Sequence, residues 1–95
     1  MTVGILTLTL HLPDCHSLKE KRRLIKPILA RLHKEFNVSV VEFGHHDTWQ
    51  RCELLIACAA SPGDYAERTL ASVVTFYESH WPDLPLTQEK IEIIA

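Results

Sequence analysis

Paired cysteines and long apolar runs are both missing from this chain. Its three cysteines, Cys15, Cys52 and Cys58, form no C-x-x-C motif and no even-numbered set. This excludes a disulfide framework and a cysteine-pair zinc site, and it fits a reducing compartment. The N-terminal segment MTVGILTLTLHL has no basic residue before its apolar part and falls far short of the roughly 20 apolar residues that span a bilayer. We therefore expect a cytoplasmic protein without membrane association.

Glycine and aromatic residues are scarce as well, and there are no repeats or low-complexity tracts. The 95 residues include three glycines and 7% aromatic residues. The hydrophobic content of 46% and the net charge of −2 are ordinary for a folded domain. A chain of this length can bury roughly 60–70% of its unfolded surface in one core. We expect a single domain over residues 1–95.

What the chain does have is a strongly uneven distribution of charge. The segment 17–36 holds seven of the ten basic residues and two of the twelve acidic ones, so its net charge is +5 and that of the remainder is −7. The basic residues of this segment are Lys19, Lys21, Arg22, Arg23, Lys26, Arg31 and Lys34. The molecule is therefore strongly dipolar.

The same segment is predicted to form one amphipathic helix. Ser17 and Glu20 have the S-x-x-E spacing of a capping box. An apolar stripe at helical spacing consists of Leu18, Ile25, Ile28, Leu29, Leu32 and Phe36. Lys19, Arg23, Lys26 and Lys34 fall on the opposite side, with Arg22 beside them. Pro27 removes one backbone hydrogen bond, but the stripe continues in phase past it, so we expect no break.

The remaining pattern predicts four strands and a second helix. Residues 3–12 alternate, with Leu6, Leu8, Leu10 and Leu12 on one face, which is typical of a strand whose leucine face lies in the core. Further strands are predicted at 38–43, 51–60 and 90–94. A second helix is predicted at about 64–80, with an apolar stripe of Ala66, Leu70, Val73, Val74 and Tyr77. The order β-α-β-β-α-β predicts an α+β, ferredoxin-like sandwich. In this fold two helices cover one face of a four-stranded antiparallel sheet of order 4-1-3-2.

This topology is expected to bring one set of polar and aromatic residues to a single end of the sheet. The first two strands and the second helix end there, and the third strand and the first helix begin there. The set consists of His11, Cys15, His16, His45, His46, Asp47, Trp49, Gln50, Arg51, His80 and Trp81. We expect the two tryptophans to seal this end of the core rather than to stack on bases.

Three short segments carry a resemblance to a known family. HSLKEKRR at 16–23, FNVSV at 36–40 and HHDTWQR at 45–51 resemble the YlxP-like family of bacterial proteins of unknown function, over essentially the whole chain. The first motif is matched by His16, Leu18, Lys19, Lys21 and Arg22, and the second by His45, Asp47, Trp49, Gln50 and Arg51. His46 and Pro27 depart from the family pattern. The resemblance implies a small, cytoplasmic, ferredoxin-like protein. Its genes commonly lie beside those for translation initiation and ribosome maturation factors, which implies an RNA- or ribosome-associated role and supplies no catalytic residues.

The basic helix is the predicted site for RNA or a ribosomal particle. Lysine and arginine side chains on one helix face can neutralise phosphates and release counterions. The residues assigned to this site are His16, Lys19, Arg22, Arg23, Lys26, Lys34, His45 and Arg51. The alternative is that this face of the helix is simply exposed to solvent and binds nothing. The pI of about 6.3 does not indicate a general nucleic-acid binder. Base stacking as in RNA-recognition motifs is not expected, because the open faces of strands 1 and 3 carry no aromatic residue.

The open face of the sheet is the second predicted interaction surface. Val3, Ile5, Val41, Phe43 and Leu55 form an apolar patch there, together with Ala57. Such a patch usually marks an interface, and a closed two-fold dimer is the commonest homo-oligomer. The alternative function is therefore an oligomeric protein-interaction or small-ligand-sensing module. The patch could instead be covered by C-terminal residues or by the long side chains of Arg51 and Lys90.

No metal, cofactor or enzymatic site is predicted. His11, His16, His45, His46 and Cys15 could ligate a metal, but no H-x-x-x-H or C-x-x-C spacing fixes a geometry. The loop 13–16 lacks the glycine and arginine with which acylphosphatases of this fold cradle phosphate. Cys15 precedes a helix N-terminus, which can lower a thiol pKa, but His16, which follows it in the sequence, need not act as its base. We expect a non-catalytic protein.

Overall fold

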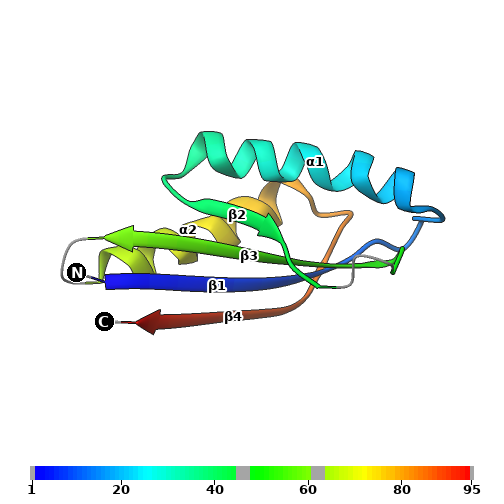
Figure 1. Ribbon diagram of the computed structural model, residues 1–95. Helices are drawn as coiled ribbons and strands as arrows, with labels where there is room; N and C mark the ends of the chain where they lie inside the picture. Colours follow the sequence, from blue (N-terminus) through cyan, green and yellow to red (C-terminus); the bar gives the residue numbers. More distant parts are fainter. Residues whose placement is uncertain (1, 45–47, 61–63, 95) are drawn as a thin grey trace.

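Six elements make up the part of the chain, residues 2–44, 48–60 and 64–94, that the computed structural model describes. They are β1 (Thr2–His11), α1 (Leu18–Glu35), β2 (Ser39–Glu42), β3 (Arg51–Ala60), α2 (Tyr65–His80) and β4 (Leu86–Ile94). The strands form one antiparallel sheet of order β2-β3-β1-β4. The helices form a second layer against it (Figure 1). The predicted ferredoxin-like fold with strand order 4-1-3-2 is confirmed.

The core forms where the leucine face of β1 meets both helices. Leu6, Leu8, Leu10 and Leu12 have no exposed surface. The buried hydrophobic residues of the helices are Ile25, Ile28, Leu32, Ala66, Leu70, Val73 and Tyr77. Each buried aliphatic side chain contributes roughly 1.5–3 kcal/mol to folding. The predicted alternation of β1 and the predicted apolar stripes of both helices are therefore confirmed at these positions.

The first helix begins with a side-chain cap and runs through Pro27 as one helix. Ser17 is the N-cap residue, and its hydroxyl oxygen accepts a hydrogen bond from the Glu20 N–H at 3.1 Å. The predicted capping box is half right, because the Glu20 carboxylate accepts from the His16 N–H at 3.5 Å instead of from the N–H of Ser17. The cap fixes where α1 starts relative to the end of β1.

The last strand differs most from its sequence-based prediction. It begins at Leu86 rather than at residue 90, so β4 is a nine-residue edge strand. This polar segment forms a strand because it pairs with β1. The register has an irregularity at Thr9 and Leu10, where the Thr87 hydroxyl donates a hydrogen bond of 3.3 Å to the Thr9 carbonyl. Within the described ranges, neither helix has the length and apolar character of a membrane span.

Candidate functional site

Five cations of α1 form an exposed stripe on the side of the helix away from the sheet. They are Lys19, Arg22, Arg23, Lys26 and Lys34, and each is exposed. At 100° per residue they fall within about a third of the helix circumference, and from Lys19 to Lys34 they extend over about 22 Å of helix. Among residues 2–44, 48–60 and 64–94, none of the five forms an ion pair. We call these five residues the basic stripe.

Lys21 is a sixth cation of the same helix, yet its side chain is buried. The residue is only 2% exposed. Its Nζ donates a hydrogen bond of 2.8 Å to the Thr48 carbonyl and lies 3.4 Å from the Glu42 carboxylate. Sequence reasoning missed this burial, although the 3-4-3 spacing of Leu18, Lys21, Ile25 and Ile28 was a visible signal. Lys21 therefore belongs to the structure of this end of the fold and not to the basic stripe.

Hydrogen bonds join the loop before α1 to the loop before β3. The Gln50 side-chain amide donates to the Cys15 carbonyl at 2.7 Å, and the Leu12 N–H donates to the Gln50 carbonyl at 2.8 Å. Together with Lys21, these bonds tie the chain before α1 to the chain before β3. Cys15 is buried beneath them, while His16 is exposed. The predicted meeting of Cys15, His16 and Gln50 at one end of the sheet is confirmed.

Two exposed side chains extend the polar surface on the open face at this end. His11 and Arg51 are direct partners in the pairing of β1 with β3, and both are exposed. They also line a shallow pocket of about 390 Å³ with Gln50 and Thr87. His45, His46 and Asp47, which were assigned to this surface, lie outside the described residues. Within the described part of the chain, no group of three histidine, cysteine or acidic side chains could hold a metal ion.

Two predicted members of this end lie elsewhere. His80 stacks on Phe76 with 3.9 Å between ring centroids, and Trp81 packs 6.0 Å from the same ring. Phe76 in turn contacts Phe36 and Arg31, at the far end of α1. The prediction that His80 and Trp81 join His16 was wrong, because α2 ends beside the last turns of α1. Trp49 is 45% exposed, so its predicted role as a core seal was also wrong.

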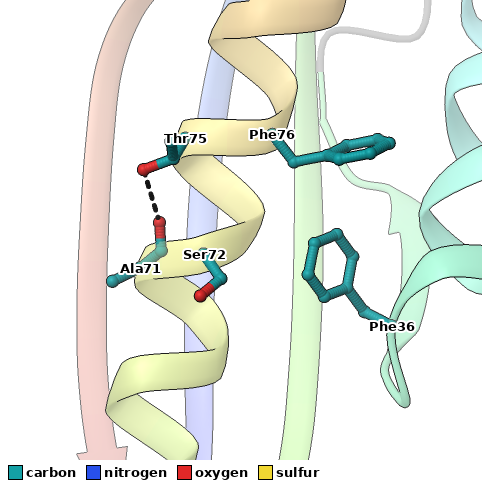
Figure 2. Close-up of a pocket in the computed structure, with 5 residues that line it drawn as sticks. All are labelled: Phe36, Ala71, Ser72, Thr75 and Phe76. Carbon is teal, nitrogen blue, oxygen red and sulfur yellow. Dashed lines mark hydrogen bonds between the residues drawn. The ribbon is translucent and has the colours of Figure 1, made fainter.

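The contact between the helices frames a shallow groove that the sequence did not reveal. Figure 2 shows Phe36 and Phe76 facing one another across it, with Ala71, Ser72 and Thr75 along α2. The two rings meet edge to face, 5.4 Å apart. The groove has no cationic lining residue, so it does not extend the basic stripe.

The open sheet face exposes the apolar patch that the alternation predicts. Val41 and Phe43 are 53% and 51% exposed. Val41 is paired with Leu55 of β3, and Ile5 with Ala57. Leu55, Val3 and Ile5 are partly covered by their neighbours in the sheet. The most exposed part of the patch is therefore on β2 and just after it.

Burial also determines the chemistry of Cys52, near the start of β3. The pKa of the Cys52 thiol is raised from 9.0 to about 12, chiefly because burial desolvates the thiolate and in smaller part because of the Glu42 carboxylate, while Lys21 opposes the shift. A thiol with this pKa is protonated at neutral pH and is a poor nucleophile. Cys52 is thus a small apolar core residue on β3.

A family of proteins and one bacterial relative match this chain over most of its length. The family model described as "Protein of unknown function (DUF503)" matches residues 3–91, from β1 into β4. The "Uncharacterized protein YlxP" of Bacillus subtilis (strain 168) is 42% identical over 79 residues, an alignment that covers 83% of this chain and 85% of that protein. Neither description states an activity.

Proposed function

The chain belongs to the DUF503 family of proteins of unknown function, and from this premise we propose that it is a non-catalytic accessory protein that binds RNA or a ribosomal particle through the basic stripe of α1. The family membership agrees with the YlxP-like resemblance of its motifs. The description of the family assigns no function, so the proposal depends on the geometry of the stripe. His16 extends the proposed surface at the start of α1. Arg51, which was also assigned to this site, lies on the open face of the sheet, opposite the helix layer.

The observation that supports this proposal is that several cations outside the basic stripe form ion pairs, whereas those of the stripe form none among the described residues. Arg31, Arg68 and Lys90 each lie within 3.3 Å of a carboxylate oxygen, and Lys21 lies 3.4 Å from one. All four are outside the basic stripe. Among the described residues, the stripe therefore concentrates on one exposed surface cations that form no ion pair, which favours contact with a polyanion.

The expected mode of binding is recognition of phosphates and shape. On the open face, β1 and β3 present Val3, Ile5, Thr7, Arg51, Glu53, Leu55 and Ala57. None of these side chains can stack on a base in the way that sheet-based RNA-recognition motifs require. A positively charged helix face instead contacts the backbone, so binding should depend weakly on sequence.

Binding of the purified protein to ribosomal particles at low and moderate salt tests this proposal. The variant Lys19→Glu/Arg23→Glu/Lys26→Glu should lose at least about tenfold in affinity, because three phosphate contacts become repulsive. A matched pair of single variants, Arg23→Glu on the stripe and Arg68→Glu on α2, changes the net charge equally. Only Arg23→Glu should weaken binding. Equal binding by the triple variant and the wild type would exclude the stripe as the site.

A second candidate function is docking of a partner protein or a second copy onto the open sheet face. The exposure of Val41 and Phe43 favours it, since contiguous exposed apolar groups usually mark an interface. Light scattering of Phe43→Asp/Leu55→Asp should then show a smaller particle than the wild type. Tyr65→Asp, at an exposed position on α2, is the control. An unchanged mass of the double variant would rule out self-association through this face.

A further inference from the structure

The outer edge of β4 is a long open strand edge. β4 has nine residues, and every residue after Leu86 is exposed. The opposite edge of the sheet, β2, has only four residues. Proteins usually protect edge strands by making them short, by charged side chains, by proline or by bulges, because the unpaired backbone groups can pair with another chain. β4 does carry charges, at Glu89, Lys90 and Glu92. β4 contains no proline, and its one irregularity lies at its start, opposite Thr9 and Leu10.

The hydrogen bonds of β1 show which backbone groups of β4 face outward. The His11 N–H donates to the Pro85 carbonyl, toward β4, and the Leu12 N–H donates toward β3. Backbone groups alternate sides along an antiparallel strand, so Thr9, Thr7, Ile5 and Val3 also face β4. Their partners are Gln88, Lys90, Glu92 and Ile94. The N–H and C=O groups of Glu89, Ile91 and Ile93 are consequently those at the free edge.

The side chains at this edge leave apolar surface uncovered next to the core. Ile91 and Ile93 pair with Leu6 and Gly4, so they lie on the helix side of the sheet. They are nevertheless 38% and 45% exposed. α2 contacts β1 and β3 as well as β4, and it leaves both side chains partly uncovered. A strand added beside β4 would cover both isoleucines.

From these features we propose that β4 pairs antiparallel with β4 of a second copy of this chain, about a two-fold axis at Ile91. In this register Ile91 meets the Ile91 of the other copy on the helix side, and Glu89 is opposite Ile93. On the open face, Lys90 of each copy is opposite Glu92 of the other. The two sheets join into one continuous sheet, and all the outward backbone groups of Glu89, Ile91 and Ile93 are paired.

Charge selects this register over its neighbours. In an antiparallel pair, a residue whose backbone N–H and C=O point to the free edge must lie opposite another such residue. The register between the two copies can therefore shift only so that Glu89, Ile91 and Ile93 stay opposite outward-facing residues of the other copy. A two-fold axis at Lys90, at Glu92 or at Glu89 would place that residue directly opposite the same residue of the second copy. Two like charges would then face each other. Like charges directly opposite one another destabilise a strand pair, whereas opposite charges stabilise it. The axis at Ile91 gives two Lys–Glu pairs.

The proposed dimer leaves the basic stripe accessible. α1 packs over β2 and α2 over β4, and Figure 1 shows α1 on the side of the sheet away from β4. Joining two copies along β4 therefore places their two basic stripes at opposite ends of the assembly. The inference does not require that the stripe binds RNA, and its test measures mass alone.

Charge exchange across the interface tests the proposal with the full chain. Lys90→Glu and Glu92→Lys each put like charges opposite one another in both pairs, and each should weaken dimerisation at least about tenfold in sedimentation equilibrium. An equimolar mixture of the two variants should dimerise as the wild type does, because each mutant strand then faces its complement. Mixing cannot restore the contact of 3.3 Å between Lys90 and Glu92 within one chain, so recovery reports pairing between chains.

Three results would overturn the proposal. One is a wild-type protein that remains monomeric at the highest concentration measured, and another is a mixture that remains as monomeric as its components. The third is a dimer that Phe43→Asp/Leu55→Asp dissociates while Lys90→Glu does not, since that dimer uses the open face. Far-ultraviolet circular dichroism of each variant confirms that the monomers are folded.

Discussion

At the scale of the residue, Lys21 holds together the end of the fold where α1 begins. Its ammonium group joins α1 to the Glu42 carboxylate at the end of β2 and to the Thr48 carbonyl before β3. A buried charge is tolerated only when it is paired and hydrogen-bonded. Removing one partner of such a pair costs more than the pair contributes, because the other partner stays buried without compensation.

Lys21→Met should therefore destabilise the protein by about 2–4 kcal/mol, since Glu42 and the Thr48 carbonyl both lose their donor. The change keeps the length of the side chain and removes only its charge and donors. Lys19→Met, two residues earlier in α1 and on the exposed stripe, should cost less than about 0.5 kcal/mol. Urea unfolding of both variants measures the difference. Equal stability of the two would show that the buried contacts contribute nothing.

Cys52 gives the fold a pH dependence in the alkaline range. Burial holds its pKa near 12 in the folded protein, against 9.0 for an unperturbed thiol. Above pH 9 the unfolded chain releases this proton while the folded chain keeps it, so stability falls as the pH rises toward 12.

We expect this thiol alone to reduce the free energy of unfolding by about 1 kcal/mol per pH unit in that range. Cys52→Ala should make the alkaline loss shallower, and Cys58→Ala, another buried cysteine of β3, is the control for the lost volume. Urea unfolding at a series of pH values from about 8 to 10.5 gives the slopes. Identical slopes for Cys52→Ala and the wild type would contradict the expectation. Tyr77, whose pKa is also raised by burial, adds to the loss in both proteins.

At the scale of the element, the connection from α2 to β4 depends on one hydroxyl group. The Tyr77 ring is fully buried, and its hydroxyl donates a hydrogen bond of 2.6 Å to the Leu84 carbonyl. The following residues bring Pro85 to the N–H of His11, which is where β4 joins the sheet. The start of β4 is therefore anchored from the helix layer.

Tyr77→Phe should lower the free energy of unfolding by about 1–2 kcal/mol, because the Leu84 carbonyl loses its donor while the ring remains. Hydrogen exchange should accelerate most in the first residues of β4. Tyr65→Phe, at an exposed position on α2, should leave both stability and exchange unchanged. Exchange in β4 that is the same in Tyr77→Phe and the wild type would show that pairing with β1 is sufficient to hold the strand.

At the scale of the whole molecule, the separation of charge is the property most relevant to a polyanionic partner. The net charge is only −2, but the segment 17–36 carries +5. Binding through the stripe would therefore be local and would depend strongly on ionic strength, while the rest of the surface repels phosphate.

If all five stripe residues contact phosphates of a single-stranded RNA, the logarithm of affinity should fall with the logarithm of salt concentration with a slope of about −3.5. Lys19→Glu/Arg23→Glu/Lys26→Glu should reduce the magnitude of that slope by about 2. Fluorescence anisotropy with a labelled RNA between about 50 and 200 mM salt measures both slopes. A wild-type slope near zero would show that the bound surface is not the stripe.

The sequence by itself determined the order of the elements, the leucine face of β1, the apolar stripes of both helices and the exposure of the five stripe cations. These features follow from periodicity, because a residue's place on a strand or a helix depends on its local neighbours. Strand order followed too, since few topologies satisfy six elements in this order.

Only the tertiary structure decided which residues meet across the fold. The helical spacing places Lys21 on the inner side of α1, but its ammonium group is paired there only because Glu42 and Thr48 arrive from other segments, and no local pattern specifies such partners. Trp49 stays exposed. His80 and Trp81 pack against Phe76, which in turn contacts Phe36 and Arg31. β4 extends to Leu86 because β1 supplies hydrogen-bond partners to a segment whose own composition is polar. Contacts between distant segments depend on packing geometry, which the spacing of residues along the chain does not contain.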